Sequence, residues 1–208
     1  MNRRGLSYLI LLTGAVLLLV GCASGTAPGG ERRYGLEVAD AVDAVQRGEA
    51  REALAYYERE AADLERRGQG REAAKAYSAV ALVSSRLGAY QKAIHSGLQA
   101  LELLKPEPKT EGAVSIQVSV YSTIAHGYRR AGDLEEARRY FEQGLDLTKS
   151  FPRLRRSLTW SGNLLRGLAS VAYAQGDYPG ALKHGMEAVD PQTAHPYYWA
   201  SFILIGAR

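Results

Sequence analysis

Residues 118–149 carry two apolar stripes separated by a short polar break. Within each stripe the side chains recur mostly every three or four residues, which is the spacing of one face of an amphipathic helix. The first stripe consists of Tyr121, Ile124, Ala125 and Tyr128, and the second consists of Leu134, Ala137, Phe141 and Leu145. Between them, Gly132 suits a left-handed helix C-cap and Asp133 can cap the following helix. The pattern predicts a helical hairpin.

The same hairpin pattern recurs along the chain. Glycines that follow one candidate helix and precede another are Gly48, Gly88, Gly132 and Gly176, and the last three stand 44 residues apart. At this offset Tyr77 aligns with Tyr121, Ala81 with Ala125 and Ala169, and Ala93 with Ala137 and Ala181. Because neither helix can bury its apolar stripe alone, stacked copies of the unit are expected. We predict four hairpins, at about residues 35–67, 71–104, 113–149 and 159–189, within a repeat domain of residues 34–190.

The first hairpin is the least regular of the four. The break at residues 68–70, Gly-Gln-Gly, leaves open whether the helix before it pairs with the preceding or with the following helix. This ambiguity concerns the framing of the repeats and leaves the all-α fold class unchanged.

The repeated unit resembles the tetratricopeptide repeat family. Tyr121, Ala125 and Tyr128 stand for the large and small residues of that family's first helix, and Ala137 and Phe141 for the small and aromatic residues of its second. The period here is longer than the usual 34 or so residues, and glycine replaces Phe141 in the neighbouring units. The resemblance implies an all-α, right-handed superhelix of antiparallel helix pairs with a concave face.

The N-terminal residues 1–22 have the pattern of a bacterial export signal. Arg3 and Arg4 precede an apolar run, Leu9 to Val20, that is too short for a stable membrane span. The run closes on Leu-Val-Gly-Cys at residues 19–22, which resembles the lipobox of bacterial lipoproteins. That resemblance implies acylation of Cys22 and cleavage before it; a plain secretory signal with an incidental cysteine is the alternative. Residues 23–33 are rich in Gly, Ser, Thr and Pro and predict a flexible linker.

Composition narrows the classes of function. The chain has a single cysteine, so no disulfide framework or cysteine metal site is expected. Without residues 1–22 the chain holds 24 Lys and Arg against 22 Asp and Glu, a balance that does not favour nucleic acid as a partner. The four histidines lack the spacing of a metal site, and no G-x-S-x-G or phosphate-binding motif occurs. We therefore expect no cofactor, no metal and no enzyme activity.

The C-terminal residues 191–208 depart from the repeat pattern. Pro196 stops a helix, and an aromatic and β-branched run, residues 197–205, follows it. The segment Pro-Tyr-Tyr-Trp-Ala at 196–200 resembles the extreme C-terminus of the CHAT domain, a caspase-like protease fold. The catalytic elements of that domain are missing from the sequence. We interpret residues 191–208 as a CHAT remnant or as an apolar segment that covers the last repeat.

The resemblance to tetratricopeptide repeats also predicts a binding groove, lined by the outward residues of each first helix. Carried over to this chain, they are Lys75, Ser78, Arg86, Ser122, His126, Arg129, Arg130, Asn163, Arg166, Ser170 and Tyr173. This set contains several cations and no carboxylate, which favours an extended peptide with acidic side chains or a free C-terminal carboxylate. A merely solvated helix face is the alternative.

Together these features predict a lipid-anchored scaffold or assembly factor that binds another protein at the bacterial cell envelope. Ala23, which follows the predicted lipidation site, is not Asp, and by the sorting pattern of such lipoproteins this favours the periplasmic face of the outer membrane. The rival hypothesis is a truncated or inactive member of the proteases that join tetratricopeptide repeats to a CHAT domain.

Overall fold

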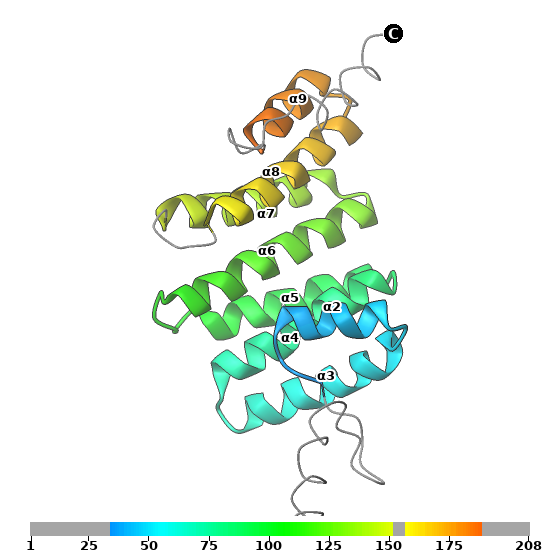
Figure 1. The fold of residues 1–208 in the computed structure, drawn as a ribbon, viewed down its shortest axis with the longest axis vertical. Coiled ribbons are helices and arrows are strands. Elements are labelled where there is room, and N and C mark those ends of the chain that lie inside the picture. Colours follow the sequence, from blue (N-terminus) through cyan, green and yellow to red (C-terminus); the bar gives the residue numbers. More distant parts are fainter. Residues whose placement is uncertain (1–33, 152–156, 189–208) are drawn as a thin grey trace, which may run out of the picture. The chain divides into compact units, whose positions relative to one another are not determined.

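The computed structural model describes residues 34–151 and 157–188 (Figure 1). All regular elements in these residues are α-helices, which confirms the predicted all-α fold class. The helices are α2 (Val38–Gln46), α3 (Ala50–Arg66), α4 (Gly70–Arg86), α5 (Tyr90–Leu104), α6 (Glu111–Ala131), α7 (Leu134–Ser150), α8 (Ser157–Ala174) and α9 (Tyr178–Glu187). The predictions for residues 1–22, 23–33 and 191–208 lie outside the described part of the chain.

The turn between α6 and α7 has the two caps that the sequence predicts. Gly132 ends α6 with φ 92°, in the left-handed region that glycine adopts without a steric penalty. Asp133 begins α7, because its side chain accepts a hydrogen bond from the backbone nitrogen of Glu136 at 3.2 Å. Left-handed glycines also occur at Gly88 and Gly176, so the aligned breaks share one turn conformation.

Consecutive helices pack as pairs, and the pairs stack in chain order (Figure 1). Helices α4, α6 and α8 contact one another in sequence and form one layer, whereas α5 and α7 lie on the other side of it. Helix α2 extends the first layer, because it packs against α4. Helix α3 packs more extensively on α4 than on the shorter α2, just as α5 packs on α6 and α7 on α8.

The main apolar core runs between the stacked pairs. Ile124, Ala125, Ala137 and Phe141 are fully buried in it, so both predicted stripes face inward. A Cβ on Gly167 would lie 2.3 Å from Cε1 of Phe141, so α8 passes Phe141 closely because position 167 has no side chain.

The replacement of Phe141 by glycine in the preceding unit has a similar cause. A Cβ on Gly97 would lie 2.5 Å from Cγ1 of Ile124. The large side chain at this junction therefore comes from α6 rather than from α5. Position 97 therefore has to be glycine. Ile124 of α6 fills the space that an aromatic residue at position 97 would occupy.

The N-terminal end of the array is held by three tyrosines. Tyr34, Tyr56 and Tyr57 have ring centroids 5.4 to 5.9 Å apart. The hydroxyl of Tyr57 donates a hydrogen bond to the carbonyl of Gly35 at 2.9 Å. These contacts fix the chain just before α2, and they place the first turn of α2 beside α4.

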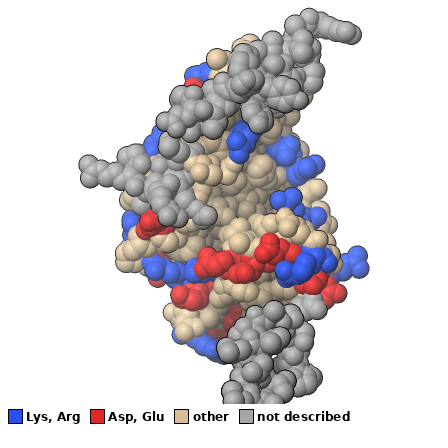
Figure 2. All heavy atoms as spheres, in the orientation of Figure 1, with Lys and Arg blue, Asp and Glu red and all other residues tan. Residues whose placement is uncertain are grey.

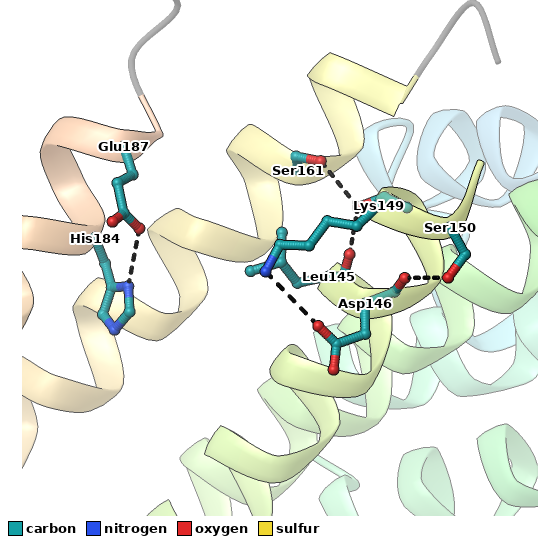
Figure 3. Close-up of polar contacts among 8 residues, drawn as sticks. Leu145, Asp146, Lys149, Ser150, Ser161, His184 and Glu187 are labelled. Atoms are coloured by element: carbon teal, nitrogen blue, oxygen red, sulfur yellow. Dashed lines mark hydrogen bonds and ion pairs between the residues drawn. The ribbon is translucent and has the colours of Figure 1, made fainter. Parts of the chain in front are cut away.

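A polar contact between Thr148 and Ser161 also joins α7 to α8 (Figure 3). Thr148 donates to the carbonyl of Leu145 at 2.7 Å, so the hydroxyl of Ser161, 2.9 Å away, is the donor to Thr148. This contact anchors the first half of α8, which contains Asn163 and ends just before Arg166. Among the residues that the structure describes, no helix combines the length and hydropathy of a membrane span.

Candidate peptide-binding groove

The layer of α4, α6 and α8 is hollowed into a groove of about 820 Å³. The first turn of α2 borders the groove together with these three helices. All the groove residues predicted from the sequence line it except Tyr173. Tyr173 is 49% exposed and packs edge-on against Tyr178, with ring centroids 5.5 Å apart. The structure thus brings ten of the eleven candidates to one cavity, while their role in binding stays a prediction.

Helix α6 contributes a continuous polar face to the groove. Its lining residues include Ser115, Ser119, Ser122, His126 and Arg129. They are spaced by four, three, four and three residues, which places them on one side of a helix. Sequence reasoning missed Ser115 and Ser119, although their helical spacing ahead of Ser122 is a signal that could have found them.

Positive charge dominates the groove. The lining cations are Lys75, Arg86, Arg129, Arg130 and Arg166, and Glu37 is the single carboxylate that lines it in the described part of the chain. Figure 2 shows this face, with acidic side chains gathered in the region of α2 and Lys and Arg side chains at the edges of an uncharged area. The uneven distribution favours a ligand that carries negative charge on the α6 and α8 side of the groove.

The groove was expected to contain no carboxylate, but Glu37 lines it. Its Oε1 atom lies 2.7 Å from Nζ of Lys75, although the Glu37 side chain is 70% exposed. Sequence reasoning missed it because the irregular first hairpin did not show that the start of α2 borders α4. Lys75 therefore has an acidic partner within the chain, and Arg166 donates to Asn163. No described carboxylate pairs with Arg129 or Arg130.

Arg129 is the most constrained of these cations. Its Nε atom is buried and has no hydrogen-bond partner among the described residues. Burial, and secondarily the neighbouring Arg130, lower the pKa of the Arg129 guanidinium. A buried donor without an acceptor is costly. An anionic group in the groove would satisfy it through a charge-assisted hydrogen bond.

One comparison with known proteins finds a family of repeats that the second half of the chain resembles. Residues 116–190, which include all of α7 to α9, match a family model described as tetratricopeptide repeat. This segment is similar to a tetratricopeptide repeat array. The described helix pairs on either side of residue 116 continue the same stack, so the fold is a tetratricopeptide-like superhelix of antiparallel pairs.

Two further comparisons concern solved structures and curated protein sequences. A crystal structure of BtubC (BKLC) from P. vanneervenii is similar to this chain at 15% sequence identity. The similarity covers 76% of this chain and 81% of that chain, with a TM-score of 0.40. No curated protein sequence matches the chain.

His126 lines the groove as a neutral side chain. Its ring packs edge-on against Phe141, with centroids 5.0 Å apart. Burial, followed by the charges of Arg129, Arg130 and Arg86, lowers the pKa of His126 to about 4. The imidazole is therefore uncharged at neutral pH, and it adds a polar atom to the groove without adding charge. No cluster of potential metal ligands occurs among the described residues.

The lowered pKa of His126 predicts a pH-dependent stability. The unfolded chain binds a proton at His126 near pH 6.5, whereas the folded chain binds it only near pH 4. The free energy of unfolding should therefore fall as the pH is lowered between these values, by up to about 2 kcal/mol from pH 7.5 to pH 5. Urea unfolding of the parent chain and of a His126→Gln variant at both pH values tests this. An equal fall in both proteins would contradict the assignment.

Proposed function

We propose that the groove binds an extended segment of another protein through carboxylates, either acidic side chains or a free C-terminus. Tetratricopeptide repeats generally bind other proteins, and the charge of this groove indicates the chemistry of the ligand. The observation that carries the proposal is the buried, unpartnered Nε of Arg129, which lies in a cavity that also contains Arg130 and Arg166. A carboxylate there would accept hydrogen bonds from donors that the fold already holds in place.

The groove also suggests how such a segment would be oriented. Lys75, near α2, is already paired with Glu37, whereas no described carboxylate is paired with Arg129 or Arg130. The serine hydroxyls of α6 lie between these regions and can hydrogen-bond to peptide backbone. The acidic part of the ligand should therefore lie toward α6 and α8.

A titration with defined peptides tests this proposal. We expect a fluorescent peptide with several Asp and Glu residues to bind the full chain, with an affinity that decreases as salt is raised. A peptide of the same sequence with Asn and Gln in place of Asp and Glu, and with an amidated C-terminus, is the matched control. Equal binding of the two peptides, or no binding of either at millimolar concentration, would contradict the proposal.

We further propose that Cys22 carries a lipid that tethers the array to a bacterial membrane, with the periplasmic face of the outer membrane favoured. The support is the order of features in residues 1–22: two arginines, a short apolar run, a small residue and then cysteine. More than one acyl chain gives stable anchoring, whereas a single chain is marginal. The anchored protein would then act as a scaffold or assembly factor that holds its partner at the cell envelope.

The anchor proposal predicts the effect of one substitution. A Cys22→Ser variant, expressed in bacteria, should lose incorporation of labelled fatty acid and should leave the detergent-soluble membrane fraction. The parent chain should be labelled and should remain in that fraction. If the variant is labelled and fractionates as the parent does, Cys22 is not the site of attachment.

A further inference from the structure

Helix α9 carries an apolar stripe that no described residue covers. Tyr178, Leu182 and Met186 stand four residues apart, so they lie along one side of the helix. Their exposed fractions are 54%, 38% and 58%, and no residue of α9 is buried. Tyr173 adjoins the stripe through its edge-on contact with Tyr178. The alignment of these side chains along one side of the helix makes the stripe a candidate contact surface.

The equivalent face of α5, an earlier helix of the array, is covered by the next helix pair. The residues of α5 at the repeat positions of Tyr178 and Leu182 are Tyr90 and Ile94. Ile94 is only 5% exposed. A Cβ on Gly127 of α6 would lie 2.9 Å from its Cγ1 atom, so the next helix pair packs directly on this position. Helix α9 therefore exposes the face through which α5 contacts its successor.

The other face of α9 is already occupied by α8. Helices α8 and α9 pack against each other, and the half-buried residues of α9 include Ala181, His184 and Gly185. His184 lies 3.6 Å from Glu187 on the same helix (Figure 3). The stripe is therefore a second surface of α9, separate from the one that holds the helix in the array.

We propose that the chain's own residues 197–205 cover this stripe and complete the last repeat. The chain continues for 20 residues after Ala188. The large apolar side chains in that stretch are Tyr197, Tyr198, Trp199, Phe202, Ile203, Leu204 and Ile205. The stripe extends for two helical turns, about 12 Å, and nine extended residues span about 30 Å, so the run is long enough to cover it.

The connection between α9 and this run also fits a return of the chain along the helix. Residues 189–196 contain Pro191 and Pro196, which disfavour continuation of the helix. A segment tethered by such a short link has an effective concentration in about the millimolar range. It therefore covers the stripe in preference to a second copy of the chain at ordinary protein concentrations.

Tryptophan fluorescence tests this proposal in the full chain. The chain has two tryptophans, so a Trp160→Phe background leaves Trp199 as the reporter. We expect Trp199 to be protected from acrylamide, independently of protein concentration. A Leu182→Lys substitution should raise its quenching severalfold and shift its emission to longer wavelength. Leu87→Lys is the matched control, because Leu87 is 41% exposed and lies outside the stripe; it should leave Trp199 unchanged.

Each other outcome overturns the proposal. In the Trp160→Phe chain that retains Leu182, acrylamide could quench Trp199 as readily as it quenches free tryptophan. This result would mean that the segment does not cover the stripe. Protection that increases with protein concentration would assign the contact to a second copy. Equal effects of the two lysine substitutions would mean that the response is not local to the stripe. Far-ultraviolet circular dichroism verifies folding, and Met186→Lys replaces Leu182→Lys if that variant loses helicity.

Discussion

Replacement of Phe141 by alanine is expected to lower the free energy of unfolding by about 3 to 5 kcal/mol. Phe141 is fully buried in the core that joins the helix pairs, and its ring lies against the backbone of α8 at Gly167. Removal of the ring leaves a cavity at the junction of α7 and α8. Urea unfolding should show a lower midpoint, and Glu142→Ala, an exposed position on the same helix, should change stability by less than about 0.5 kcal/mol.

A second substitution makes this test specific to the junction. Gly167→Ala should destabilise the parent chain, because the new Cβ would overlap the ring of Phe141. In the Phe141→Ala background the same change should be neutral or stabilising by up to about 1 kcal/mol, since alanine favours a helix over glycine. Additive losses in the double variant would contradict the direct contact between the two residues.

Charge reversal of two groove arginines is expected to weaken binding of the acidic peptide about 100-fold, or about 3 kcal/mol. Arg129→Glu and Arg166→Glu replace donors by carboxylates in the cavity, so the peptide loses charge-assisted hydrogen bonds and meets repulsion. The melting temperature should stay close to that of the parent, because Arg166 is exposed and the replacement of Arg129 removes a buried donor that has no described partner. Fluorescence anisotropy measures the affinity, and thermal unfolding measures the stability.

The control for this experiment is a double variant with the same change in net charge. Arg51→Glu and Lys183→Glu lie on exposed positions of α3 and α9, outside the groove. If binding depends on the local arrangement of cations, this variant should keep the parent affinity within a small factor. An equal loss of affinity in both double variants would mean that overall charge, rather than the groove, attracts the peptide.

Much of the fold could be predicted from the sequence, because helix ends and buried helix faces are marked by residues close together in the chain. Gly132 and Asp133 mark a helix end and a helix start by their own backbone preferences, and the structure has both caps. The 3.6-residue spacing of the apolar stripes decides which side of each helix is buried. The alignment at 44 residues then predicts the stacking, because equivalent residues need equivalent neighbours.

The parts that the sequence did not predict depend on contacts between distant residues. Glycine at position 97 is explained by Ile124 of the next unit, which a comparison of equivalent positions alone does not reveal. The place of Glu37 beside Lys75 depends on how the short helix α2 packs on α4. Tyr173, predicted as a groove residue, instead faces Tyr178 because α9 turns back at Gly176.

The most direct test of the account is a map of where the acidic peptide contacts the array. Nuclear magnetic resonance spectra of the labelled chain, recorded during a titration, report the affected backbone amides. We predict shifts concentrated on the groove faces of α4, α6 and α8, with the largest near Arg129, and few on α5 and α7. Shifts centred on α5 and α7, or spread evenly over all the helices, would contradict a carboxylate-binding groove.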